Sequence, residues 1–324
     1  MQRNIYVDNI DRDEIRSGFL VTSHRKKLWN VQLNLLVEFE RICQKHNLKW
    51  NIACGSLLGA ARHKGFIPWD DDVDIMMFRP DYEKFKRIAP SELDPKYFFD
   101  IWYNYVHEGD PNPENFPVMK REHLQKYPYL PFSPFIKLRD PNTTFLKYTD
   151  VEELIQGIFI DIFPLDPVPT FDEPEQSKIF WAGEEIRRAV TYPDQLKEEI
   201  LLGKPLYTPR EQLQEILSMP FRERALAYEN YLADNYFESE YVNFITFGSL
   251  PKGSPFRIVP LLRKYHDKLT RLPFEQIEVW APEEYEALLT MQYGDWRTPR
   301  MSHVHAQIYS VDVPYKEYFA AQSR

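Results

Sequence analysis

Apolar residues recur at helical and strand spacings along the first part of the chain. Residues 24–48 are expected to form a helix, because apolar positions follow three- and four-residue steps: Leu28, Val31, Leu35, Phe39, Ile42 and Cys43. Residues 49–54 then fit a short strand, and a second helix is expected to begin at Gly55. Residues 72–78 alternate as a strand. Pro80 suits the first position of a following helix.

The middle of the chain has a stronger strand pattern. Residues 97–103 and 135–138 are expected to be strands, and the Pro-rich stretch 107–134 between them an irregular excursion. Residues 157–163 alternate strictly, and Pro164 is expected to end that strand and open a loop over 164–169.

Beyond residue 171 the pattern becomes mainly helical. Amphipathic spacing predicts helices over 180–190, 210–236 and 282–293. The fold class is therefore α/β of the α+β kind. We expect a mixed core over residues 1–170 and a mainly helical part over 171–324, which can also pack on the core as one domain.

Charge and composition exclude several classes of protein. The 324 residues hold 40 Lys and Arg against 49 Asp and Glu, a net charge of −9, which argues against nucleic-acid binding through overall charge. Two cysteines exclude a disulfide framework and a four-cysteine zinc site. We expect no secretory signal, because residues 1–16 are polar and mixed in charge, and the sequence has no apolar run of about 20 residues. We therefore expect a cytoplasmic protein without a transmembrane segment, and contact with the inner face of a membrane stays open.

Four carboxylates fall within five residues, at Asp70, Asp71, Asp72 and Asp74. Strand geometry places the Cα atoms of Asp72 and Asp74 on one face, about 6–7 Å apart. Carboxylates this close raise each other's pKa unless a cation compensates them. A hard divalent ion, Mg²⁺ or Mn²⁺, is the natural partner, and a solvated acidic loop is the alternative.

Asp161 is the one charged residue in an otherwise apolar strand. If that strand lies beside residues 72–78, Asp161 joins Asp72 and Asp74 in a metal cluster suited to phosphoryl transfer. Otherwise, Asp161 is a buried carboxylate that accepts backbone N–H groups.

Basic and small residues near the acidic cluster suit a phosphate group. Gly55 and Ser56 precede the predicted helix, where free N–H groups and a hydroxyl can bind phosphate, although ordinary strand-to-helix turns also use Gly and Ser. Arg62 and Lys64 could neutralise more phosphate charge or simply be surface residues. His63 could act as a general base or be a packed histidine.

Lys137 and Arg139 alternate along a predicted strand. They either point at the site or form cross-strand ion pairs, with Asp140 or a neighbour.

Taken together, Gly-Ser, a strand with Asp-x-Asp and a third Asp on a later strand follow the layout of the nucleotidyltransferase superfamily. The stretch GSLLGAARHKGFIPWDDDVDI from Gly55 resembles the signature of the LicD family of bacterial phosphocholine transferases, whose relatives include fukutin-related glycan phosphotransferases. Three further segments fit the family: residues 136–145, residues 157–166 (GIFIDIFPLD) and the tetrapeptide Tyr293-Gly294-Asp295-Trp296.

The resemblance implies a nucleotidyltransferase-like mixed sheet flanked by helices and a metal-dependent reaction. A CDP-activated donor, CDP-choline by preference, would transfer its phospho-alcohol to a sugar hydroxyl of a cell-surface glycan or its precursor, such as lipopolysaccharide or teichoic acid. Asp72, Asp74 and Asp161 would bind the metal, and Gly55 and Ser56 the donor phosphate. Two other functions stay open: nucleotidyl transfer to a sugar or small molecule, and a catalytically inactive nucleotide-binding scaffold.

Overall fold

The computed structural model describes residues 5–127, 130, 134–170, 172–243, 261–301 and 308–322. Contacts group the chain into two compact units, each built from separate stretches: Met1–Asp100, Ile136–Pro164 and Lys264–Arg324 in the first, and Ile101–Phe135 and Leu165–Arg263 in the second. A single boundary near residue 170 does not coincide with these units, since both are discontinuous along the chain. Helices and a mixed sheet occur together, so the predicted α+β class is confirmed.

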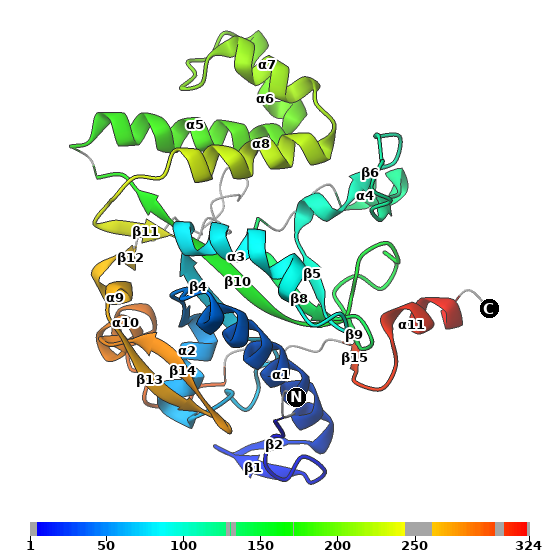
Figure 1. Ribbon diagram of the computed structural model, residues 1–324, viewed down its shortest axis with the longest axis vertical. Coiled ribbons are helices and arrows are strands. Elements are labelled where there is room, and N and C mark those ends of the chain that lie inside the picture. The colour runs from blue at the N-terminus through cyan, green and yellow to red at the C-terminus, as the bar shows by residue number, and fades with distance from the viewer. Residues whose placement is uncertain are drawn as a thin grey trace. The chain divides into compact units, whose positions relative to one another are not determined.

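The first unit is built on five hydrogen-bonded strands (Figure 1). In spatial order they are β3 (Asn51–Ile52), β4 (Asp74–Phe78), β10 (Ile158–Val168), β8 (Ile136–Asp140) and β5 (Phe98–Asp100). Strand β10 therefore lies between β4 and β8, which places Asp161 beside the strand that follows the acidic residues. The sequence analysis made the adjacency of these two strands the condition for Asp161 to join Asp72 and Asp74 in one cluster.

Three antiparallel pairs of short strands complete the sheets of this unit. They are β1 (Glu14–Arg16) with β2 (Phe19–Val21), β13 (Leu269–Phe274) with β14 (Ile277–Pro282), and β9 (Thr144–Leu146) with β15 (Ile308–Ser310).

Six helices lie in the described residues of the first unit. They are α1 (Ser23–Lys45), α2 (Cys54–His63), α3 (Arg79–Glu92), α9 (Lys264–Asp267), α10 (Tyr285–Tyr293) and α11 (Tyr315–Gln322). The Thr22 hydroxyl accepts the N–H of Arg25 and caps α1, and apolar residues of this helix, among them Leu35 and Phe39, are fully buried. Burial of each such side chain contributes about 1.5–3 kcal/mol. The predicted helix over residues 24–48 is confirmed within a few residues.

Strand β10 corrects one prediction. It runs through Pro164 to Val168, so the loop expected over residues 164–169 is wrong. Residues 158–162 pair with β8 and residues 166–168 pair with β11 (Tyr241–Asn243). Pro164 falls between these two ladders, where its missing N–H costs no ladder hydrogen bond.

The second unit is mainly helical in its described residues. Its helices are α5 (Pro174–Thr191), α6 (Pro193–Leu201), α7 (Arg210–Ser218), α8 (Phe221–Asp234), the short α4 (Arg121–Lys126) and the 3-10 helix η1 (Trp102–Asn104). Helices α5 and α8 pack side by side (Figure 1). The single helix predicted over residues 210–236 is two helices, because Pro220 cannot continue a helix interior.

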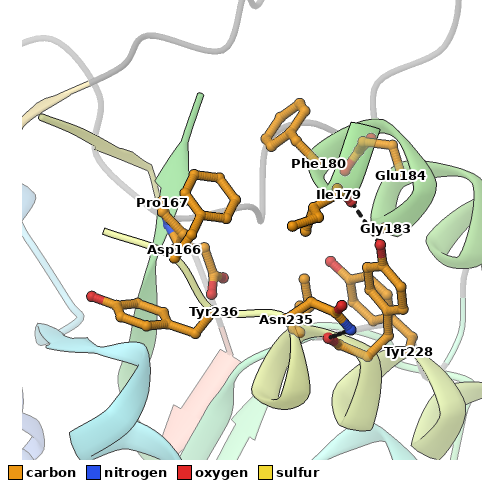
Figure 2. Close-up of a pocket in the computed structure, with 12 residues that line it drawn as sticks. Asp166, Pro167, Ile179, Phe180, Gly183, Glu184, Tyr228, Asn235 and Tyr236 are labelled. Carbon is orange, nitrogen blue, oxygen red and sulfur yellow. Dashed lines mark hydrogen bonds between the residues drawn. The ribbon is translucent and has the colours of Figure 1, made fainter. Parts of the chain in front are cut away.

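Short strands accompany these helices. Strands β6 (Val106–His107) and β7 (Val118–Met119) pair in parallel, and β11 pairs with β12 (Leu261–Leu262). A pocket within this unit lies between the end of β10 and helices α5 and α8, with Asp166, Phe180, Glu184, Tyr228 and Tyr236 in its wall (Figure 2). No helix in the described parts of either unit is long and apolar enough to cross a membrane.

Candidate metal and phosphate site

The acidic residues form a short connection that leads into β4. Residues 70–73 belong to neither a helix nor a strand, and Asp74 is the first residue of β4. Asp70, Asp71 and Asp72 each place one carboxylate oxygen within 4.8 Å of the others, a spacing that a single cation can span. The oxygen donors needed for a hard divalent ion are therefore gathered here.

Asp161 is attached to this connection through the backbone. Its N–H donates to the carbonyl of Val73 at 2.8 Å, so the acidic connection and β10 are directly joined. The structure thus brings Asp72 and Asp74 close enough to Asp161 for its charge to act on both. Asp70 and Asp71, which the sequence analysis left outside the predicted ligand set, belong to the same group of acids.

Burial and like charges destabilise the ionised form of these acids. The pKa of Asp72 is well above its ordinary value, because burial removes water and Asp74, Asp70 and Asp161 are negative neighbours. Burial, Asp161 and Asp70 likewise raise the pKa of Asp74, while Lys137 opposes the rise. A cation would stabilise the ionised carboxylates, so the donor set and its electrostatics fit a divalent metal. The ligand set itself stays a prediction.

Lys137 is the positive side chain of the cluster. The register of β8 and β10 places it opposite Asp161, and its ammonium forms an ion pair with that carboxylate. The same ammonium lies 3.9 Å from the centre of the Phe159 ring, a cation–π contact. Burial lowers the pKa of Lys137, and Asp161 opposes that change. Arg139, two residues on, pairs with Asp100 instead of Asp140.

Gly55 and Ser56 lie in the first turn of α2, next to the acids. The Ser56 hydroxyl accepts the backbone N–H of Asp74 at 3.0 Å. A Cβ on Gly55 would lie 2.7 Å from a carboxylate oxygen of Asp70, so a side chain here would displace that carboxylate from its present position. Both residues therefore hold the acidic connection against α2. Their predicted contact with the donor phosphate stays a prediction.

The basic residues at the end of α2 have structural partners of their own. Arg62 donates to the Trp296 carbonyl at 2.8 Å and to Nε2 of His63 at 2.9 Å. Burial and the neighbouring Arg62 and Arg16 lower the pKa of His63 to about 4, so His63 is neutral at pH 7. Its Nε2 lone pair accepts from Arg62, which disfavours the role of general base. Lys64 is exposed and ends α2 in a left-handed conformation. Donor contacts of Arg62 and Lys64 stay predictions.

Tyr293 lies near the acids, a position that the sequence analysis did not assign. Burial and the nearby Cys54, Asp74 and Asp70 raise the pKa of the Tyr293 phenol, so it keeps its proton at neutral pH. The Tyr293 to Trp296 segment, singled out above only as a motif, is tied to α2 through Arg62. The motif was the available signal, but its distance along the chain gave no indication that Tyr293 lies near the acids.

An α+β unit, carboxylates clustered beside β4 and β10 and the N-terminus of α2 near them form the arrangement that the sequence analysis expected of a phosphoryl-transfer site. Residues 47–173 match the family model described as LicD/FKTN/FKRP, nucleotidyltransferase domain. The resemblance to this family is thereby confirmed, and the matched range contains Gly55, Ser56 and the acids of both strands.

Individual relatives agree with the family match. The lipopolysaccharide cholinephosphotransferase LicD of Haemophilus influenzae is 33% identical over 145 residues, which is 45% of this chain and 44% of that protein. Human ribitol 5-phosphate transferase FKRP is 36% identical over 81 residues, 24% of this chain and 16% of that protein. An uncharacterized protein of Rickettsia typhi is 43% identical over 57 residues, 18% of each chain. The aligned region thus spans less than half the length of each of these relatives.

Proposed function

We propose that this protein transfers a phospho-alcohol, phosphocholine by preference, from a CDP-activated donor to a sugar hydroxyl of a cell-surface glycan or its precursor. The observation that carries the proposal is the cluster of carboxylates in residues 70–74 beside Asp161 of β10, within the range that matches the family. Two relatives are named for transfer of cholinephosphate and of ribitol 5-phosphate, both phospho-alcohols. We place the reaction in the cytoplasm, with contact at the inner membrane face as a further prediction.

The reaction joins the acceptor oxygen to the phosphorus that carries the alcohol. The bond between that phosphorus and the bridging oxygen of the diphosphate breaks, and CMP leaves with the bridging oxygen. The acceptor hydroxyl loses its proton to a carboxylate, for which we propose Asp161. Its partner Lys137 would hold that carboxylate in place.

The remaining roles follow from the positions of the side chains. Asp72, Asp74 and Asp161 would hold Mg²⁺ or Mn²⁺, with Asp70 and Asp71 beside them. When bound, the ion would stabilise negative charge on the donor phosphates and on the leaving CMP. Gly55 and Ser56 at the N-terminus of α2 would face the donor, where the helix dipole favours negative groups.

Product analysis tests this function against nucleotidyl transfer. The protein is incubated with Mg²⁺ and CDP-choline, CDP-ribitol or CTP, together with glycan acceptor. Release of CMP from a CDP-alcohol supports the proposal. Release of pyrophosphate from CTP supports nucleotidyl transfer, and binding of nucleotide without turnover supports an inactive scaffold.

Substitution of the acids tests the site. Asp72→Asn and Asp74→Asn should each abolish turnover. Without metal, their thermal midpoints should equal or exceed that of the unchanged protein, because each substitution removes a repelled buried charge. Asp194→Asn, at an exposed ion pair with Lys197, is the matched control and should keep full activity. Full activity in either acid variant would overturn the assignment.

A further inference from the structure

One face of α1 is directed at the backbone of the acidic connection. Arg25, Trp29 and Gln32 follow four- and three-residue steps, so they lie on the same side of the helix. All three are buried, although two are strongly polar. The sequence analysis treated α1 only as an amphipathic helix and assigned no role to these side chains.

Each of the three side chains donates to a backbone carbonyl of the acidic connection. Arg25 and the Trp29 indole N–H both donate to the Asp70 carbonyl, at 2.8 and 3.1 Å. The Gln32 amide nitrogen donates to the Asp71 carbonyl at 2.6 Å. Because residues 70–73 belong to no helix or strand, side chains supply the donors that a strand ladder would otherwise provide.

Gln32 also reaches the second acid-bearing segment. Its Nε2 atom lies 3.4 Å from the Phe159 carbonyl, two residues before Asp161 on β10. A primary amide has two N–H donors, so one nitrogen can serve both carbonyls. Gln32 therefore joins the connection that carries Asp71 and Asp72 to the strand that carries Asp161.

The surroundings of the Gln32 side chain indicate why an amide occupies this buried position. The side chain is 0% exposed, and its Oε1 atom is buried without a hydrogen-bond partner among the described residues. An unsatisfied buried oxygen is unfavourable for folding, so packing alone does not account for an amide at this position. The amide at this position is explained by its nitrogen, which donates to backbone carbonyls of both acidic segments.

Resting on the function proposed above, we propose that Gln32 is a positioning residue that preorganises the carboxylates for a divalent cation. Several repelling carboxylates tend to separate when no cation is present. The Gln32 amide opposes this by fixing the backbone of both segments. Arg25 and Trp29 fix the preceding residue in the same way. The cation then binds carboxylates that are already close together.

The test measures Mg²⁺ binding to the full chain by the rise of the thermal midpoint with Mg²⁺ concentration. Gln32→Met keeps the length of the side chain and removes both donors. Removal of a residue that orients metal ligands typically weakens metal affinity 10–100-fold. We therefore expect the half-saturating Mg²⁺ concentration to rise at least about tenfold.

Gln156→Met is the matched control. Gln156 is 3% exposed, and its amide also bonds backbone groups, at Lys147, Tyr148 and Val151. The variant should lower the midpoint without metal and leave the half-saturating Mg²⁺ concentration unchanged. An equal shift in both variants, or no shift for Gln32→Met, would overturn the positioning role.

Two further measurements complete the test. If Gln32→Met does not fold, Gln32→Leu decides, since it also removes both N–H donors from the same position. A rise in half-saturating Mg²⁺ in this variant supports the inference, and an unchanged value overturns it. Absence of any Mg²⁺ response in the unchanged protein would overturn the metal site and this inference together.

Discussion

The Ser56 hydroxyl accepts the backbone N–H of Asp74 at 3.0 Å, which links the first turn of α2 to the first residue of β4. Ser56 is 4% exposed, so water cannot replace it as an acceptor. The residue that we predicted to bind donor phosphate therefore also holds a predicted metal ligand in position.

Replacement of Ser56 should affect stability and catalysis together. Ser56→Ala leaves the Asp74 N–H buried without its acceptor, which should lower the free energy of unfolding by about 1–3 kcal/mol. Turnover should fall because Asp74 is less well held. Urea unfolding and CMP release measure the two effects. Ser91→Ala is the control, because the Ser91 hydroxyl donates to a carbonyl at an exposed position. Equal stability of Ser56→Ala and the unchanged protein would contradict the prediction.

Two glycines of α2 should respond to the same substitution in opposite ways. A Cβ on Gly55 meets only the end of the Asp70 side chain, which can move away. Gly55→Ala should therefore fold with nearly normal stability and lose most of its turnover. A Cβ on Gly59 would lie 2.4 Å from the Gly65 carbonyl oxygen, which belongs to the backbone. Gly59→Ala should lose about 1–3 kcal/mol or more of unfolding free energy. Thermal unfolding and CMP release distinguish the two, and a stable, fully active Gly55→Ala would argue against a role for the Asp70 position.

The sequence predicted those parts of the fold that are encoded by periodicity. Helix α1 and the start of α2 follow from regular apolar spacing, and so does strand β4, although it begins at Asp74 and leaves Asp72 outside the predicted strand face. The unusual Asp161 in an apolar strand indicated the second half of the site. Local patterns suffice for these features because the hydrophobic effect acts on one face of each element.

Contacts between side chains and distant backbone groups could not be predicted in this way. The bonds from Gln32 to the Asp71 and Phe159 carbonyls depend on how α1 lies against the sheet, and a carbonyl has no sequence signature. The same holds for Pro164, whose place between two ladders is set by its pairing partners. The division of the chain into two units, each made of separate stretches, likewise depends on tertiary contacts that local patterns do not encode.

Replacement of Lys137 should lower the stability of the protein, because Asp161 would lose its positively charged partner. Lys137→Met leaves the charge of Asp161 without its ion-pair partner, which should lower the free energy of unfolding by about 3–5 kcal/mol without metal. Added Mg²⁺ should recover part of this loss, because a cation replaces the missing positive charge. The second substitution Asp161→Asn should also recover stability. Lys45→Met is the control, since Lys45 pairs with Glu92 at an exposed position and should cost under about 1 kcal/mol. A Lys137→Met variant as stable as Lys45→Met would contradict this account.

His266 should make the stability of the protein depend on pH. The side chain is buried, and its Nδ1 lies 3.2 Å from the Asn51 side-chain oxygen, while Nε2 makes no hydrogen bond among the described residues. Asn51 uses its own nitrogen to donate to the Ile52 carbonyl, so its oxygen accepts and Nδ1 carries the proton. A second proton on Nε2 would place an unpaired charge in the core, and burial accordingly lowers the pKa of His266 from 6.5 to about 4.

Because the pKa of His266 is lower in the folded protein than in the unfolded chain, the unfolded chain binds more protons between these two values. Stability should therefore be lost as the pH falls from about 6.5 to 4, by roughly 3 kcal/mol from this residue. His266→Gln keeps a donor for Asn51 and cannot ionise, so its stability should fall less over this range. His63 and His107, whose pKa values burial also lowers to about 4, contribute equally to both proteins and cancel in the comparison. Urea unfolding at pH 7.5 and pH 5 measures the difference, and parallel losses in the two proteins would show that His266 is not the titrating group.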